Sequence, residues 1–195
     1  MDQPILRKKT ASPTAFADPR VPLDPALLAQ IGRYDHVTRL PNRLQFIEHF
    51  DSYAQSRSTS MLVLVTLADA RQYNETLRAL GMAFSEDFVR SGADLLASLL
   101  PDSVTIYHVS VLSFAVVLPV QDTTTYPAVA SEIAKAFTSA ITINAIPIKT
   151  HVGVGLVPLS AAQGAAESLR AALVAAQDSR NATDGMAFYN HKSDA

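Results

Sequence analysis

The segment MLVLVTL, residues 61–67, constrains the fold more than any other stretch of this sequence. Every position in it except Thr66 is apolar, and leucine alternates with valine through its centre. A run of this length is far too short to cross a membrane as a helix, which takes about 20 apolar residues. Its length and its β-branched content instead predict the central strand of a sheet, buried on both faces.

Helical and strand-like patterns follow one another on either side of this strand. We predict helices over 42–54, 70–80, 85–100, 124–139 and 165–178, and strands over 104–109, 114–118, 141–157 (broken at Pro147) and 185–190. The inner helix faces are predicted from apolar residues at helical spacing. They are Leu44, Ile47 and Phe50; Ala70, Tyr73, Leu77 and Leu80; Phe84, Phe88, Leu95, Leu96 and Leu99; Val129, Ile133 and Phe137; and Leu169, Leu173 and Ala176. This order of elements predicts an α/β (α+β) sandwich around a mostly antiparallel sheet.

The length of 195 residues suggests one domain with an additional arm. Residues 1–24 are polar and interrupted by prolines, which predicts a mobile arm, and a short helix is expected over 26–33. We therefore divide the chain into a flexible arm with a short helix (1–33), a folded domain (34–190) and a tail or linker (191–195).

The composition excludes several classes of function. A net charge of −2 offers no basic face to nucleic acid. The chain has no cysteine, which excludes disulfides and a cysteine nucleophile and fits a reducing, cytoplasmic location. The five histidines lack the spacing of a zinc site, and the sequence shows neither a secretory signal nor a membrane segment.

The segment YDHVTRLPNR, residues 34–43, resembles the opening motif of the GGDEF family, the diguanylate cyclase domains. The positions that match Asp-x-Leu-Thr-Gly-Leu-Pro-Asn-Arg are Asp35, Thr38, Leu40, Pro41, Asn42 and Arg43, while Arg39 replaces the glycine. HVGVG (151–155) and AALVAAQDSRN (171–181) resemble later family segments. The resemblance covers roughly residues 34–190. It implies a palm-like, nucleotidyl-cyclase-like fold with a mostly antiparallel five-stranded sheet flanked by helices.

The family signature, Arg-x-Gly-Gly-Asp/Glu-Glu-Phe, corresponds to residues 108–114. Its last five positions are Ser110, Val111, Leu112, Ser113 and Phe114, so that only the phenylalanine matches. The resemblance implies that active relatives join two GTP molecules with divalent metal ions, held by one carboxylate at the end of the first strand and one in the signature. Ala68 and Leu112 stand at those positions, and neither side chain can bind a metal ion.

The resemblance also supplies three possible nucleotide-binding residues. Asn74 matches the asparagine that reads guanine, and Glu86 is the candidate for its acidic partner. Arg180 is a candidate phosphate contact, although Gln177 replaces the family's triphosphate lysine. The alternative for Asn74 is a solvated helix residue. We predict no catalytic residue, no metal site and no cofactor, although active relatives are expected to use magnesium and GTP.

Several polar or small residues have a structural interpretation beside a functional one. No Gly-x-Ser-x-Gly elbow surrounds Ser110 and Ser113, so we expect them to satisfy strand ends. His108 is expected to be a hydrogen-bonded sheet histidine. Gly153 and Gly155 are expected to allow close packing against a helix. Asn42 is expected to cap the helix that follows it.

Three functions remain open from the sequence. The first is a catalytically inactive GGDEF domain that acts as a regulatory or protein-interaction module in cyclic di-GMP signalling. The second is a GTP-binding allosteric sensor without turnover, and the third is an active diguanylate cyclase with unusual residues. The resemblance implies an EAL-type phosphodiesterase domain or another signalling protein as the partner, and it leaves a homodimer possible.

Overall fold

The structure, a computed structural model, describes residues 32–55, 60–119, 125–139, 141–159, 163–182 and 185–189. The predicted arm and its helix over 26–33 lie outside the described residues apart from Gly32 and Arg33. The predicted tail over 191–195 also lies outside them.

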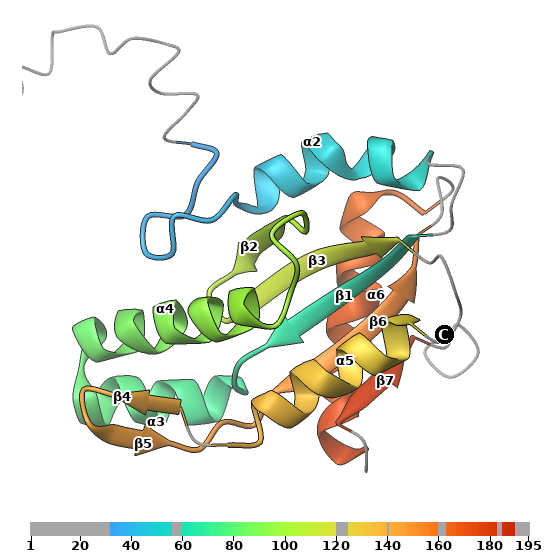
Figure 1. Cartoon of the computed structure of the whole chain (residues 1–195). Coiled ribbons are helices and arrows are strands. Elements are labelled where there is room, and N and C mark those ends of the chain that lie inside the picture. Colours follow the sequence, from blue (N-terminus) through green and yellow to red (C-terminus); the bar gives the residue numbers. More distant parts are fainter. Residues whose placement is uncertain are drawn as a thin grey trace, which may run out of the picture.

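A five-stranded sheet forms the middle layer of the domain, in the order β2-β3-β1-β6-β7. The strands are β1 (Ser60–Thr66), β2 (Ile106–Ser110), β3 (Ser113–Pro119), β6 (Gly153–Pro158) and β7 (Met186–Phe188). Neighbouring strands are antiparallel except for β6 and β7, which are parallel. This mainly antiparallel sheet, flanked by helices, confirms the predicted α+β fold (Figure 1).

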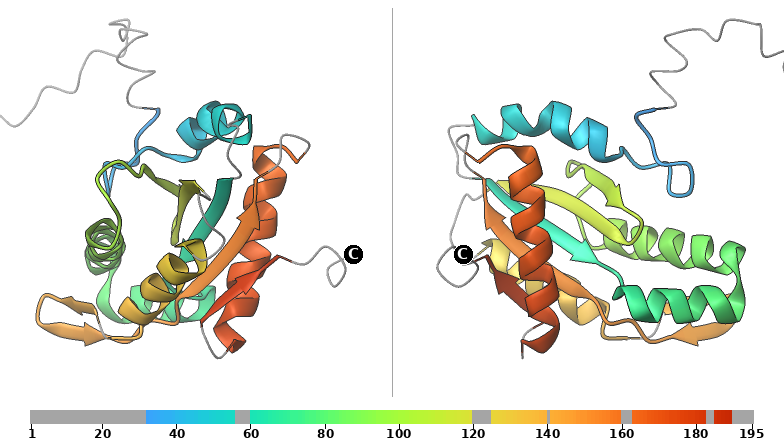
Figure 2. Two further views of the ribbon diagram at one scale, coloured as in Figure 1. Left: turned by 45° about the vertical axis from the view of Figure 1, so that its right-hand side comes forward. Right: turned by 180° about the vertical axis from the view of Figure 1, so that it is seen from behind.

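Two layers of helices cover the sheet (Figure 2). One face carries α2 (Arg43–Ala54) and α6 (Ala165–Asp178), and the other carries α4 (Met82–Ser98) and α5 (Thr125–Ala136). The helix α3 (Ala70–Leu80) lies beside α4, as does the hairpin of β4 (Ile141–Ile143) and β5 (Ile146–Ile148). None of the described helices combines the length and the apolar character that crossing a membrane requires.

Strand β1 is buried along its whole length, as its sequence predicts. Its alternate side chains enter different clusters: Val63 and Val65 pack with α4 and α5, whereas Leu62 and Leu64 pack with α2 and α6. A strand covered in this way has no face left for water, which explains why it is apolar at successive positions.

The inner faces of α2 and α3 differ from the prediction. On α2, Phe46 and Phe50 are buried, while Leu44 and Ile47 are 49% and 42% exposed. The aromatic pair faces inward because Phe46 packs edge-on against the buried Tyr107 of β2, with ring centroids 5.5 Å apart. On α3 only the middle of the predicted stripe is half-buried, and its ends, Ala70 and Leu80, are exposed.

Two other predictions require correction. Helix α4 begins at Met82, three residues before the predicted start at 85, because Gly81 with φ 86° ends α3 and caps α4 directly. Pro147 does not break a strand but lies within β5, paired with Thr142. The β4–β5 ribbon has only two strands, so a residue without an N–H can face its open edge.

Helix α6 lies unusually close to β6, and two glycines of β6 permit this approach. A Cβ atom at Gly153 would overlap the carbonyl oxygen of Ala176, and one at Gly155 would overlap that of Ala172. The expected role of these glycines is confirmed. The inner face of α6 is consequently made mostly of alanines, with Ser168 and the predicted Leu169 at its start. Leu173, also predicted to point inward, is 39% exposed.

Replacing Gly155 by alanine should therefore lower the free energy of unfolding by about 3 kcal/mol, because the new methyl group meets backbone atoms that cannot rotate away. Urea unfolding followed by circular dichroism measures the change. Gly92→Ala is the comparison: the atoms nearest to its new methyl group all belong to the side chain of Leu67, which can shift where backbone cannot, so a smaller loss than at Gly155 is expected. Equal losses in the two variants would contradict the backbone contact as the cause.

Candidate functional site

The hairpin between β2 and β3 carries the residues that were predicted to correspond to the family signature. Ser110 pairs with Ser113 as the last residue of β2 and the first of β3, so both serines satisfy strand ends as expected. At the turn each strand reaches one residue beyond its predicted bound, 109 or 114, whereas β2 begins two residues after its predicted start at 104. Val111 and Leu112 form the two-residue turn, and neither has a positive φ. The turn therefore differs from the usual two-residue hairpin turns, which need left-handed residues and favour glycine.

Contacts within the domain hold this turn in place. The carbonyl oxygen of Leu112 accepts a hydrogen bond of 2.9 Å from the N–H of Leu67, and the Leu112 side chain is half-buried against the core. The buried hydroxyl of Ser113 lies 3.3 Å from that of Thr66 on β1. Val111 is 60% exposed. Leu112, predicted to stand at the position of the signature acid, is thus an apolar residue that anchors the turn.

The end of β1 faces this turn but offers little to a metal ion. Ala68 is 2% exposed and carries no side-chain oxygen. The adjacent Asp69 caps α3, because its carboxylate accepts a 2.7 Å hydrogen bond from the N–H of Gln72. Its other oxygen lies 3.9 Å from Nδ1 of His151. Among the described residues, no three histidine, aspartate or glutamate side chains are grouped to hold a metal ion.

A pocket of about 190 Å³ lies between the end of β1 and the turn. It brings together the predicted residues Ser110, Val111, Leu112, Ser113 and Arg180, along with Ala68 and Gln177. Phe114 is absent from its lining; its ring is fully buried and stacks on His108. We call this the signature pocket.

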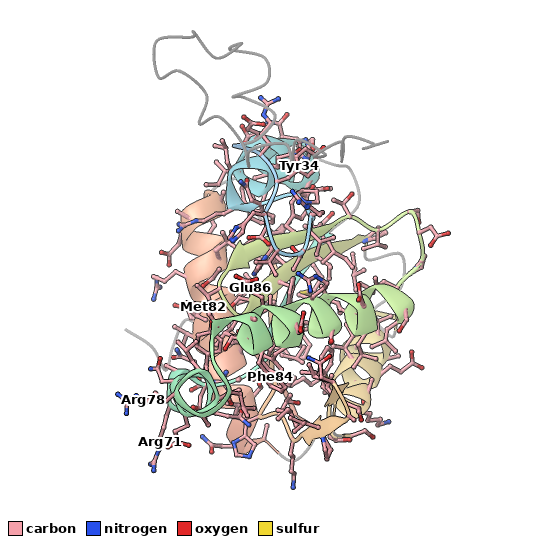
Figure 3. The ribbon with its side chains drawn as sticks, turned by 90° about the vertical axis from the view of Figure 1, so that its left-hand side faces the viewer. Tyr34, Arg71, Arg78, Met82, Phe84 and Glu86 are labelled. Carbon is pink, nitrogen blue, oxygen red and sulfur yellow. The ribbon has the colours of Figure 1, made fainter. Side chains whose placement is uncertain are left out.

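The other two predicted nucleotide contacts lie outside the signature pocket. Asn74 is exposed in the middle of α3, between Arg71 and Arg78, which project from the helix in Figure 3. Glu86 is half-buried near the start of α4, and Figure 3 shows it on that helix. The guanine contact predicted for Asn74 and its alternative, a solvated helix residue, both remain predictions.

The Arg180 guanidinium is hydrogen-bonded to the backbone of its own domain. Its Nη2 donates a 3.1 Å hydrogen bond to the carbonyl oxygen of Ala68, and its Nε donates one of 2.9 Å to that of His151. Burial lowers the pKa of this guanidinium from its ordinary value, and the charge of Asp69 offsets the effect only in part. The residue joins the end of β1 to the segment before β6, which the sequence gives no signal to predict.

His108 connects the opening motif to the hairpin. Its Nδ1 lies 2.9 Å from the Asp35 carboxylate and 3.2 Å from the Thr38 hydroxyl, and its Nε2 lies 3.4 Å from the carbonyl oxygen of Val111. Because a carboxylate can only accept, Nδ1 carries the proton that is shared with Asp35. The backbone N–H of His108 also donates to Pro41. The expectation of a hydrogen-bonded sheet histidine is confirmed, whereas its partners were not predicted.

Asp35 is the centre of a small polar cluster. Burial by itself raises its pKa, but hydrogen bonds from Thr38 and His108, together with the nearby His108 ring, outweigh burial and lower it. Its Oδ1 accepts from the N–H groups of Val37 and Thr38, at 3.0 and 2.8 Å. Arg39 follows with φ 62°. This left-handed conformation costs a residue other than glycine about 1–2 kcal/mol.

Asn42 completes the opening motif. Its side-chain oxygen accepts from the N–H groups of Leu44 and Gln45, which confirms it as the N-cap of α2. The opening motif thus shapes the loop around Asp35, caps α2 through Asn42 and is hydrogen-bonded to β2 through His108.

Residues 33–184 match the sequence model of the family described as "Diguanylate cyclase, GGDEF domain". The chain is 32% identical over 158 residues to the cyclic di-GMP phosphodiesterase PA2567 of Pseudomonas aeruginosa, which corresponds to 80% of this chain and 27% of that protein. The chain therefore spans only about a quarter of the length of this curated relative.

Solved structures are similar as well. The crystal structure of the GGDEF domain of PA2567 is 31% identical with a TM-score of 0.69, covering 76% of this chain and 94% of that one. A diguanylate cyclase/phosphodiesterase from Caldicellulosiruptor saccharolyticus has a TM-score of 0.71 at 13% identity, covering 83% and 95%. The S helix-GGDEF-EAL part of Vibrio cholerae LapD, bound to c-di-GMP, has a TM-score of 0.66 at 19% identity, covering 87% and 40%. The last two share the fold with this chain.

Replacing Asp35 by asparagine is expected to lower the free energy of unfolding at pH 7 by about 1–2 kcal/mol, because it removes a charged acceptor from several hydrogen bonds. The pKa of Asp35 lies below its ordinary value of 3.8 in the folded chain, so the stabilisation is present above pH 3.8 and lost as the pH falls through the folded-state value. The difference between the parent and the variant should shrink below pH 3.8 in urea unfolding.

Asp51→Asn is the control, because Asp51 is an exposed residue of α2. A change within about 0.5 kcal/mol is expected for this variant at any pH. A parent–variant difference for Asp35 that stays constant down to the acid transition would contradict the assigned role.

Proposed function

The chain belongs to the GGDEF domain family, and we propose that it is a catalytically inactive member that acts as a regulatory, protein-interaction module in cyclic di-GMP signalling. The observation that carries the proposal is the chemistry of the signature pocket. Of the described residues that line it, only Asp69 has a carboxylate, and that group caps α3.

Joining two nucleotides at a phosphate depends on neutralising charge that develops in the transition state. Magnesium serves this purpose only where hard oxygen ligands hold it. Ala68 supplies a carbonyl oxygen that already accepts from Arg180, and Leu112 supplies a hydrocarbon side chain. The residues present do not fit a magnesium–triphosphate complex, and we derive no catalytic step through one.

The backbone of the turn supports the same conclusion. Two glycines in this place would let N–H groups approach a phosphate closely. Here Val111 places a branched, exposed side chain beside the pocket, and Leu112 commits its carbonyl to Leu67. The hairpin keeps its shape through these internal contacts and needs no nucleotide to order it.

The partner proposed for this module is a phosphodiesterase domain of the EAL type or another signalling protein. A relative of which this chain matches about a quarter is named as a cyclic di-GMP phosphodiesterase. LapD, which has the same fold in its GGDEF part, joins such a domain to an EAL domain in one chain. A GGDEF domain without catalytic activity still has a rigid folded surface through which it can contact and regulate a neighbouring domain.

GTP binding without turnover is the competing proposal, and Arg180 is the residue that favours it because it lines the pocket. Asn74 and Glu86, its other support, lie elsewhere. Calorimetry with GTP, with and without magnesium, distinguishes the two. We expect no heat of binding up to about 1 mM GTP, the concentration that corresponds to a free energy of about −4 kcal/mol. Saturable heat would replace the first proposal by the second.

Incubation with GTP and either magnesium or manganese, followed by chromatography, tests for activity directly. We expect no cyclic dinucleotide from this chain, because its pocket holds no pair of carboxylates for the metal. An active diguanylate cyclase treated in parallel confirms that the assay detects the product. Formation of cyclic di-GMP by the purified chain would overturn the proposal.

The role of Leu112 as an anchor gives a separate prediction. Leu112→Glu should lower the free energy of unfolding by about 2 kcal/mol at pH 7, because it places a charge where a half-buried side chain packs on the core. Val111→Glu, on the exposed neighbour in the same turn, is the control and should change it by no more than about 0.5 kcal/mol. An L112E variant as stable as the parent would show that this position carries no packing role.

A further inference from the structure

A second hollow, of about 280 Å³, adjoins the signature pocket and shares Ser110, Ser113 and Leu173 with it. It lies between the first residue of α2, the end of the β2–β3 hairpin and α6. Its other lining residues are Arg43, Leu64, Val109, Ala166, Leu169 and Arg170.

The lining of the hollow is mostly apolar. Leu64 and Leu169 are buried, Val109 is half-buried, and Leu173 is 39% exposed. Leu173 is a large side chain on the outside of a helix whose inner face is already complete. Hydrophobic lining with a few well-placed polar groups is the usual character of a small-molecule site.

Two arginines line the hollow, and they differ in whether an acidic side chain pairs with them. Arg170 forms a bidentate ion pair with Glu167, at 2.8 and 2.6 Å, and its Nη2 also donates to the Tyr189 hydroxyl. Arg43 is exposed, and within the described part of the chain it makes no hydrogen bond or ion pair through its guanidinium. The hollow therefore has one uncompensated positive charge beside an apolar surface.

We propose that this hollow binds a small organic acid, with its apolar body on Leu169 and Leu173 and its carboxylate on Arg43. A guanidinium pairs with a carboxylate through two parallel hydrogen bonds, which fixes orientation as well as charge. The exposed hydroxyl of Ser110 adds a hydrogen-bond donor at the hairpin end. The volume is slightly below the usual range of ligand pockets, about 300–1,000 Å³, so the acid is small.

This site is separate from the function proposed above. It shares Ser110, Ser113 and Leu173 with the signature pocket, but none of the predicted nucleotide contacts Asn74, Glu86 and Arg180 lines it. A chain that fails to bind GTP can bind the acid, and a chain that proves to be an active cyclase can do so too. The outcome of one test therefore does not decide the outcome of the other.

The test uses 4-phenylbutyrate as the probe and the neutral 4-phenylbutanamide as its matched analogue, each titrated into the full 195-residue chain and followed by amide NMR. The acid should cause saturable shifts at residues 109–110 and 166–173, with a dissociation constant on the order of 1 mM or lower. The amide should bind about ten-fold more weakly, since it lacks the charge that pairs with Arg43.

Variants then separate the charged contact from the apolar one. Arg43→Gln should weaken the acid about ten-fold and leave the amide unchanged. Arg39→Gln, an exposed arginine of the opening motif that does not line the hollow, should change neither. Leu173→Gln should weaken both probes, because it removes apolar contact without altering charge.

Several outcomes would overturn the proposal. These are the absence of saturable shifts up to about 10 mM acid, equal binding of acid and amide, or an equal loss in Arg43→Gln and Arg39→Gln. Shifts centred on the groove lined by Lys135 and His151 would likewise refute it, since that groove is a different site.

Discussion

Strand β1 packs against helices through both of its faces, and the positions of its neighbours follow from that packing. Because Leu62 and Leu64 point to one side and Val63 and Val65 to the other, two helical layers are needed to cover them. The layer with α6 reaches β6 only through the glycine positions 153 and 155. That close approach carries the end of α6, and Arg180 beyond it, to the end of β1. The location of the signature pocket is thus a consequence of how the core closes.

The sequence predicted the helices and strands better than it predicted which side of each helix faces the core. A continuous apolar run leaves little choice for β1, and the alanine-rich helix over 165–178 agrees with α6 at both ends. Periodicity, however, permits more than one inward stripe on the same helix. On α2 the deciding contact is Phe46 with Tyr107, and on α6 it is backbone against glycine, so that Leu173 is left outside. Both contacts join segments far apart in the chain, which local patterns do not encode.

The candidate site was also predicted only in part: the sequence indicated which residues share a pocket but not the contacts they make. The signature residues and Arg180 meet in one pocket, because matching a motif to a family identifies positions that are close in space. The motif could not indicate that Arg180 bonds to the carbonyls of Ala68 and His151, since backbone acceptors have no signature in sequence. Asn74 and Glu86 lie on α3 and α4, outside the pocket.

The residues around the turn are chemically consistent with one another, because their contacts do not depend on a metal ion. A pair of carboxylates facing each other across a pocket repel unless a cation lies between them, so such a site depends on its metal. Here the turn depends on Leu112 packed on the core, on Ser113 beside Thr66, and on His108 bound to Asp35. These contacts are satisfied within the chain, so the hairpin holds its geometry without a ligand. This construction supports the role proposed above, a module that acts by contacting a partner.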